Sequence, residues 1–274
     1  MTHGRFATER FGSRQFTPAT EDELVVGFRE INTGTIVKTD GVLGAMRSPE
    51  SHEVIPGIIS VDLCEVLRYS AKALASLHGK HDYSSNLYTD IFDDKEKFPD
   101  PDAVQDAIAS GLFELINGGH VQPVETHEEI AQILQSWRNI DGVYTLANTS
   151  TLEGCELATV KMLGDYYPDC FDGIVFPRNY NGAGKITKAD ALRSVLGRLR
   201  EDGHDPHFAA HIDDTRHHVE AMTQTPPHES MTTFVLEFES NVSLRGLTNV
   251  VHGTSALEVF ELVDDHVKER SSAL

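Results

Sequence analysis

Residues 58–67, with the sequence IISVDLCEVL, decide the fold of this chain. The apolar run at 58–61 predicts a buried strand, and the spacing of apolar residues over 71–77 predicts a helix after it. Asp62 stands where the strand ends. Because open α/β sheets bind ligands at the carboxyl ends of their strands, Asp62 is a candidate functional residue. An Asp ahead of a helix is also a common capping residue, and this stretch alone favours neither role.

The composition indicates an acidic globular protein of 274 residues, with 39% hydrophobic residues and a formal net charge of −20. This charge argues against a nucleic-acid polymer as partner, because a phosphate backbone needs a basic face. The argument does not extend to a single nucleotide held by a metal ion and a few donors. The length fits one large domain with additions, and a homo-oligomer is an open alternative.

The sequence favours a cytoplasmic protein that does not associate with membranes. No apolar run approaches the roughly 20 residues that a membrane-spanning helix needs. The three cysteines have no Cys-x-x-Cys spacing, so we expect a reducing compartment rather than a disulfide framework or a zinc site.

The chain divides into three expected regions. They are an N-terminal extension at 1–57, a core at 58–225 with inserted helices at about 68–120, and a C-terminal strand and helix at 226–274. In the extension, loose alternation over 24–31, turn residues after it, and a second apolar run at 35–38 predict a β-hairpin.

Further apolar stretches in the core predict strands that end in polar residues. The stretch at 142–150, GVYTLANTS, and the stretch at 207–213, HFAAHID, both have this form. The second continues into Asp214, so two adjacent acids follow a strand. The five histidines between 204 and 218 raise the question of a transition-metal site, but their spacing places no His pair with a third ligand. We therefore expect them to be solvated loop residues.

Four stretches, in this order, resemble the motifs of the haloacid dehalogenase (HAD) superfamily. The segment DLCEVL at 62–67 is similar to the first motif, Asp-x-Asp-x-[Thr/Val]-[Leu/Val], and its ending is most similar to the 5′(3′)-deoxyribonucleotidase branch. The strand at 142–150 resembles the second motif. Lys188, with Lys185 as the alternative, resembles the third, and Asp213-Asp214 resembles the fourth.

The resemblance covers about residues 58–222 and implies an α/β fold. The expected fold is a Rossmann-like parallel sheet flanked by helices, with a small helical cap inserted after the first core strand. The resemblance further implies that Asp62 is the nucleophile. It implies that Lys188 stabilises both the Asp62 carboxylate and the phosphate.

The resemblance also implies a Mg²⁺ ion, held by Asp62, Asp213, Asp214 and the backbone carbonyl of Cys64. The chemistry agrees, because adjacent carboxylates repel one another unless a cation lies among them, and oxygen ligands suit Mg²⁺.

Two residues depart from the family pattern. Cys64 stands where the family has its second Asp, the general acid/base, and Ala147 aligns with the hydroxyl that binds the phosphoryl group. A thiol, with a reference pKa of about 8.5, is a poor substitute for a carboxyl acid. Loss of a positioned acid/base typically lowers the rate by about 10²- to 10⁴-fold. Asn148, Thr149 or Ser150 could replace the missing hydroxyl as phosphate ligand, and Asn148 and Thr149 are the candidates that we single out.

Asp62, Cys64 and Lys188 are therefore the candidate catalytic residues of three open hypotheses. The first is a Mg²⁺-dependent phosphohydrolase for a small phosphorylated metabolite such as a nucleoside monophosphate, slowed or using Glu65 or another acid. The second is a HAD-like enzyme of different chemistry, such as a phosphonatase or dehalogenase. The third is a non-catalytic HAD-like protein that binds a phosphorylated ligand or a protein.

Overall fold

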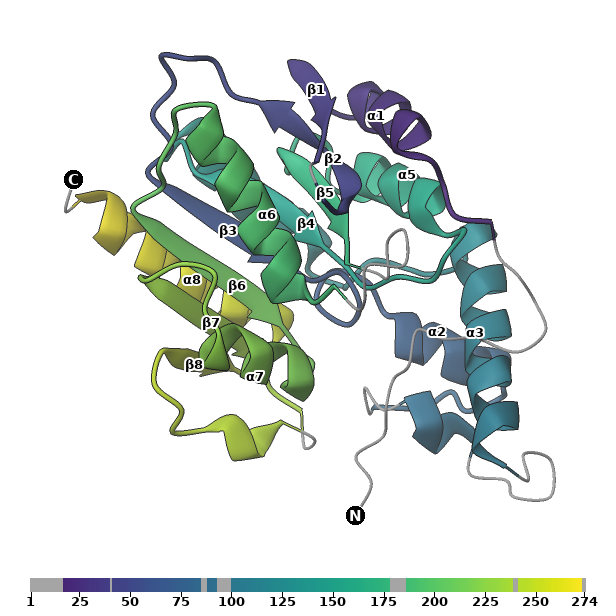
Figure 1. Cartoon of the computed structure of the whole chain (residues 1–274). Helices are drawn as coiled ribbons and strands as arrows, with labels where there is room; N and C mark the ends of the chain where they lie inside the picture. The colour runs from purple at the N-terminus through teal and green to yellow at the C-terminus, as the bar shows by residue number, and fades with distance from the viewer. Residues whose placement is uncertain are drawn as a thin grey trace.

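The computed structural model describes residues 17–39, 41–84, 88–92, 100–177, 186–238 and 241–272. Within them, eight strands form one sheet in the order β1-β2-β5-β4-β3-β6-β7-β8, with helices on both faces (Figure 1). The strands from β3 to β8 run parallel to their neighbours, whereas β2 joins β5 antiparallel. The fold is thus α/β with a Rossmann-type sheet, as predicted.

The strands are β1 (Thr35–Lys38), β2 (Leu43–Ser48), β3 (Gly57–Val61), β4 (Tyr144–Asn148), β5 (Gly173–Phe176), β6 (Phe208–Asp213), β7 (Met231–Leu236) and β8 (Val250–Gly253). The helices are α1 (Glu21–Glu30), α2 (Ser70–Leu77), α3 (Pro101–Asn117), α4 (His127–Asn139), α5 (Glu156–Tyr166), α6 (Lys188–Glu201), α7 (Arg216–Gln224) and α8 (Ala256–Ser272), with short 3-10 turns η1 (Tyr88–Phe92) and η2 (Val242–Leu244).

Strand β3 is buried along its whole length because helices cover both of its faces. Successive side chains alternate between these faces, so Ile58 packs in the cluster against α6 and Ile59 packs in the cluster against α4 and α8. Figure 1 shows α6 in front of the sheet and α8 behind it. The chain runs from β3 outward through β4 to β5 and then returns to β6 on the other side of β3. The strand order therefore reverses between β3 and β6, where such sheets bind ligands.

The N-terminal prediction was wrong in its first half. The stretch expected as a strand at 24–31 lies largely in helix α1, which begins with a capping box between Thr20 and Glu23. Leu24 and Phe28, four residues apart, form its buried face. The cap and this spacing outweigh the loose alternation of the sequence. The hairpin consists instead of β1 and β2, and β2 extends the main sheet.

Helices α2 and α3 and the turn η1 pack around a separate apolar cluster that includes Leu74, Phe92 and Leu112. Figure 1 shows α2 and α3 at the lower right, beside the sheet. The chain leaves and re-enters the core through two paired segments, with Tyr69 N donating to Gln122 O at 3.0 Å. The helices predicted after the first strand are thus present, and their apolar cluster also includes Cys155 at the start of α5.

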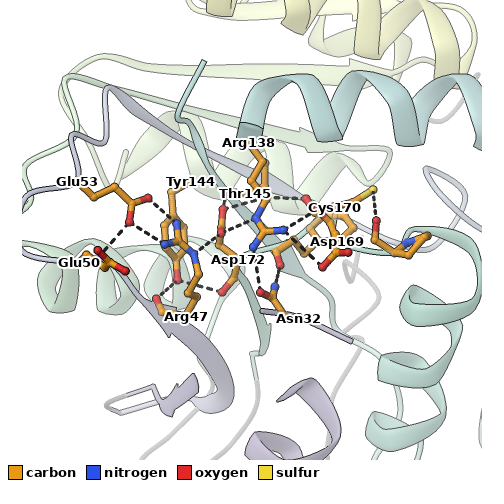
Figure 2. Close-up of polar contacts among 12 residues, drawn as sticks. Asn32, Arg47, Glu50, Glu53, Arg138, Tyr144, Thr145, Asp169, Cys170 and Asp172 are labelled. Atoms are coloured by element: carbon orange, nitrogen blue, oxygen red, sulfur yellow. Dashed lines mark hydrogen bonds and ion pairs between the residues drawn. The ribbon is translucent and has the colours of Figure 1, made fainter. Parts of the chain in front are cut away.

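A buried ionic network ties the hairpin and α4 to the start of β5 (Figure 2). The carboxylate of Asp172 is fully buried and accepts hydrogen bonds from Arg47 Nε at 2.7 Å and from Arg138 Nε at 2.8 Å. Its other oxygen accepts a bond from Thr145 N at 3.0 Å. This network lies at the amino end of β5, away from the strand ends that carry the candidate site.

Within the described ranges, no helix combines the length and the apolarity that crossing a bilayer requires.

Candidate active site

Three carboxylates meet at the point where the strand order reverses. Asp62 follows β3, Asp213 ends β6 and Asp214 follows it, and one oxygen of each lies within 4.8 Å of the others. The parallel register pairs Val61 with Ile212, and Asp62 N donates to Ile212 O at 2.9 Å, which brings the two strand ends together. All three acids are buried. We call Asp62, Asp213 and Asp214 the carboxylate cluster.

Lys188 is the cation of this site. Helix α6 begins at Lys188 because Thr187 caps it, with Asp190 completing a capping box. The Nζ atom lies 2.7 Å from Asp62 Oδ1 and 2.7 Å from Asp213 Oδ2. Burial lowers the pKa of Lys188, but the two carboxylates outweigh burial, so the pKa lies above its usual value. Lys185, the alternative, lies outside the described residues.

Two histidines surround Asp213, which corrects the prediction that the histidines between 204 and 218 are solvated. His211 is fully buried in β6, and its Nε2 lies 3.0 Å from Asp213 Oδ2. His218 of α7 places Nδ1 at 3.2 Å from the same oxygen. The alternation of β6 points His211 to the α6 face, and sequence spacing gave no sign of either contact.

The surroundings fix the protonation of Asp213 and His218. Burial raises the pKa of Asp213, but Lys188 and the histidines outweigh burial and hold the pKa well below its usual range. Burial, with the charge of Lys188, lowers the pKa of His218 to about 4. Near neutral pH, Asp213 is therefore ionised and His218 is uncharged.

The charge balance of the site fits a divalent cation. Lys188 is the one cation in contact with Asp62 and Asp213 among the described residues, so a single positive charge faces these two carboxylates. Buried carboxylates at this separation repel one another strongly without a counter-ion. The all-oxygen donor set suits Mg²⁺ better than a transition metal. The carboxylate cluster, with the backbone carbonyl of Cys64, would hold the ion.

The loop after Asp62 contains the residue that departs from the HAD pattern. Cys64 is partly exposed, and its Sγ lies 3.5 Å from Arg68 Nη2. Glu65 adopts a left-handed backbone conformation, with φ at 60°, and its Oε1 accepts a hydrogen bond from Ala71 N at 2.6 Å. Burial raises the pKa of Glu65 to about 7. Glu65 is thus a second acidic group beside Cys64 in the turn that follows Asp62.

The predicted phosphate ligands have different surroundings. Asn148 Nδ2 donates to Ser60 Oγ and to Lys188 O, both at 3.0 Å, so this side chain joins β4 to β3 and α6. The Thr149 hydroxyl is fully buried and has no hydrogen-bond partner within the described part of the chain. Ala147 pairs with Val61 in the sheet and carries no hydroxyl. Thr149 therefore retains a donor for a ligand.

Comparisons with known proteins show what this fold resembles. A provisionally assigned phosphatase from Clostridium difficile matches with a TM-score of 0.52 and 13% identity, over 78% of this chain and 99% of its own. A protein tyrosine kinase A from Mycobacterium tuberculosis matches with a TM-score of 0.52 and 16% identity, over 76% and 98%. A haloacid dehalogenase-like hydrolase family protein from Streptococcus pneumoniae has 15% identity over 76% and 98%, with a lower TM-score of 0.49.

The chain shares its α/β fold with these solved structures. No protein-family model matches the sequence. No curated protein is similar to it in sequence. Because the identities to the solved structures are low, these comparisons show the fold alone, and the activity has to be argued from the site itself.

Proposed function

We propose that this HAD-like protein is a Mg²⁺-dependent phosphohydrolase that acts on a small phosphorylated metabolite through an aspartyl-phosphate on Asp62. One observation carries the proposal. Lys188 Nζ lies 2.7 Å from both Asp62 and Asp213, within a cluster of three buried carboxylates. A nucleophilic carboxylate, a fixed cation and a metal site are the parts that phosphoryl transfer needs.

In the proposed reaction, an Asp62 oxygen attacks phosphorus in line, and the bond from phosphorus to the leaving oxygen breaks. Water then hydrolyses the aspartyl-phosphate and regenerates Asp62. Lys188 neutralises charge on the transferred phosphoryl group. Bound Mg²⁺ would supply further neutralisation of that charge. The Thr149 hydroxyl is the donor that we assign to the phosphoryl oxygens in place of the side chain missing at Ala147.

The leaving oxygen requires a proton, and we assign this role to Glu65. A general acid works best when its pKa lies near the working pH, and the pKa of Glu65 is raised to about 7. Cys64 occupies the family position of the acid, but its thiol is intrinsically a weaker acid than a carboxyl group. Glu65 shares the turn with Cys64 and interacts electrostatically with Asp62.

The residues Cys64 and Ala147 favour a second candidate function. A HAD-like protein that lacks the acid and the hydroxyl could bind a phosphorylated ligand without turnover. The same loss of the acid suits phosphonatase or dehalogenase chemistry, in which the leaving group needs no such proton.

The deciding experiment measures Mg²⁺-dependent phosphate release from nucleoside monophosphates and from an aryl phosphate. We expect release that disappears in Asp62→Asn and that increases for the nucleotides in Cys64→Asp. The aryl phosphate needs little protonation of its leaving group, so its turnover tests Asp62 separately from the acid. Wild-type release no greater than that of Asp62→Asn on every substrate would select the binding protein or the altered chemistry.

A further inference from the structure

Arg68 is a buried cation that forms no ion pair with an acid in the described part of the chain. Its side chain lies in the turn after Asp62, and the residue is 1% exposed. The guanidinium donates to Thr151 Oγ1 at 3.1 Å, to Thr159 Oγ1 at 3.3 Å and to Cys64 Sγ at 3.5 Å, all formally neutral groups. Its Nε is buried without a hydrogen-bond partner, and no carboxylate of the described residues forms an ion pair with it.

Two partly buried arginines of the described residues do have a buried acidic partner. Arg47 and Arg138 both contact Asp172, at 2.7 and 2.8 Å. This is the usual arrangement, because burying an unpaired charge costs several kcal/mol in real proteins. Asp62 and Glu65 interact with Arg68 electrostatically but form no ion pair with it. Arg68 therefore lacks the anion that the packing of the other two arginines provides.

Two contacts place Arg68 beside the proposed phosphoryl site. The guanidinium donates to Thr151, which lies in the loop after β4, two residues after the proposed phosphate ligand Thr149. Arg68 also contacts Cys64, two residues after the proposed nucleophile. An anion paired with Arg68 would therefore be adjacent to the phosphoryl group that Asp62 and Thr149 are proposed to bind.

We propose that Arg68 binds a second anionic group of the substrate, either a carboxylate or a further phosphate. The planar guanidinium is suited to both because it can donate two parallel hydrogen bonds. The inference rests on the proposed phosphate site at Asp62 and narrows its ligands. Phosphorylated acids and bisphosphates are then favoured over nucleoside monophosphates, which carry no second anion.

Equilibrium binding tests this assignment without turnover. Isothermal titration compares phosphonoacetate and methylenediphosphonate, which carry a second anion, with ethylphosphonate, which does not, in buffer containing Mg²⁺. We expect wild-type protein to bind phosphonoacetate or methylenediphosphonate, or both, about tenfold or more tightly than ethylphosphonate. Whichever probe is preferred identifies the second group as carboxylate or phosphate.

The variants Arg68→Met and Arg68→Lys complete the test. Arg68→Met should abolish the preference while ethylphosphonate affinity stays within about twofold, and Arg68→Lys should retain part of it because the charge remains. If Arg68→Met does not fold, Arg68→Lys provides the test. A smaller preference of Arg68→Lys than of wild type for the probes with a second anion would then support the proposal, and an unchanged preference would contradict it. Equal wild-type affinity for the three probes would overturn the proposal.

Two further outcomes separate this inference from the proposed function. Equal weakening of all three probes in Arg68→Met would overturn the inference, because Arg68 would then contact the transferred phosphoryl group itself. A protein without phosphatase activity that nevertheless shows the Arg68-dependent preference would support the inference while the proposed hydrolysis fails.

Discussion

At the scale of single residues, burial changes the acid–base chemistry of Glu65. Its pKa rises from 4.5 to about 7, so the folded protein binds more protons than the unfolded chain between these values. The contribution of Glu65 to stability is therefore fully present below pH 4.5 and is lost as the pH rises through about 7. We expect the difference in free energy of unfolding between wild type and Glu65→Gln to fall by about 3 kcal/mol over this range. Urea denaturation at several pH values measures it.

A matched control is Glu23→Gln at the exposed start of α1. Hydrogen bonds from the Thr20 backbone and side chain lower the pKa of Glu23, so its stabilising contribution is lost as the pH falls. The two variants should thus show opposite pH trends. A difference for Glu65→Gln that does not change with pH would contradict the raised pKa and with it the role of Glu65 as acid.

At the scale of secondary-structure elements, the network at Asp172 holds the hairpin and α4 against β5 (Figure 2). Asp172→Ala would remove the buried partner that Arg47 and Arg138 share, and leave Arg47 with Glu53 and Arg138 with the exposed Asp169. Removing one partner of a fully buried ion pair costs about 3–5 kcal/mol. Because both arginines are partly exposed and keep an acidic neighbour, we expect urea denaturation to show a smaller loss, of about 2–3 kcal/mol. Hydrogen exchange should accelerate first in β1 and β2, because Arg47 belongs to β2.

The matched control for Asp172→Ala is Glu220→Ala, which breaks the exposed pair between Arg216 and Glu220 within α7. Exposed pairs of this spacing contribute about 0.3–0.5 kcal/mol. Comparable losses in both variants would mean that the network fixes geometry without stabilising the fold.

At the scale of the whole molecule, Mg²⁺ should stabilise the protein because the folded chain assembles the carboxylate cluster and the unfolded chain does not. A ligand at about 100 times its Kd stabilises by about 2.7 kcal/mol. For a chain of this size, that corresponds to an increase in Tm of about 5–10 °C. Differential scanning calorimetry with and without MgCl₂ measures it, and Asp214→Asn should lose most of the shift.

Ionic strength needs its own control, because the chain has a net charge of −20 and any salt screens its self-repulsion. NaCl at equal ionic strength supplies this control. If NaCl reproduces the whole shift, or if Asp214→Asn keeps it, the carboxylate cluster is not the Mg²⁺ site.

Local patterns in the sequence determined the main strands and the ends that carry the site. The apolar runs that end at Asp62 and Asp213 predicted β3 and β6, because burial on both faces requires an uninterrupted apolar strand. These strand predictions needed only neighbouring residues, since periodicity and strand termini are properties of short segments. The roles predicted for Asp62, Asp213 and Lys188 came instead from the resemblance to the HAD motifs, and they stay predictions.

Only the tertiary structure determined which residues that are distant in the sequence contact one another and how these contacts change their pKa values. Sequence spacing did not indicate that His211 contacts Asp213, that Arg68 forms no ion pair with an acid of the described residues, or that Glu65 has a raised pKa. It also predicted a strand where packing and a capping box produce α1. Burial and electrostatic coupling arise from residues far apart in the chain, as Asp62 and Asp213 are, and they exist only once the sheet has formed.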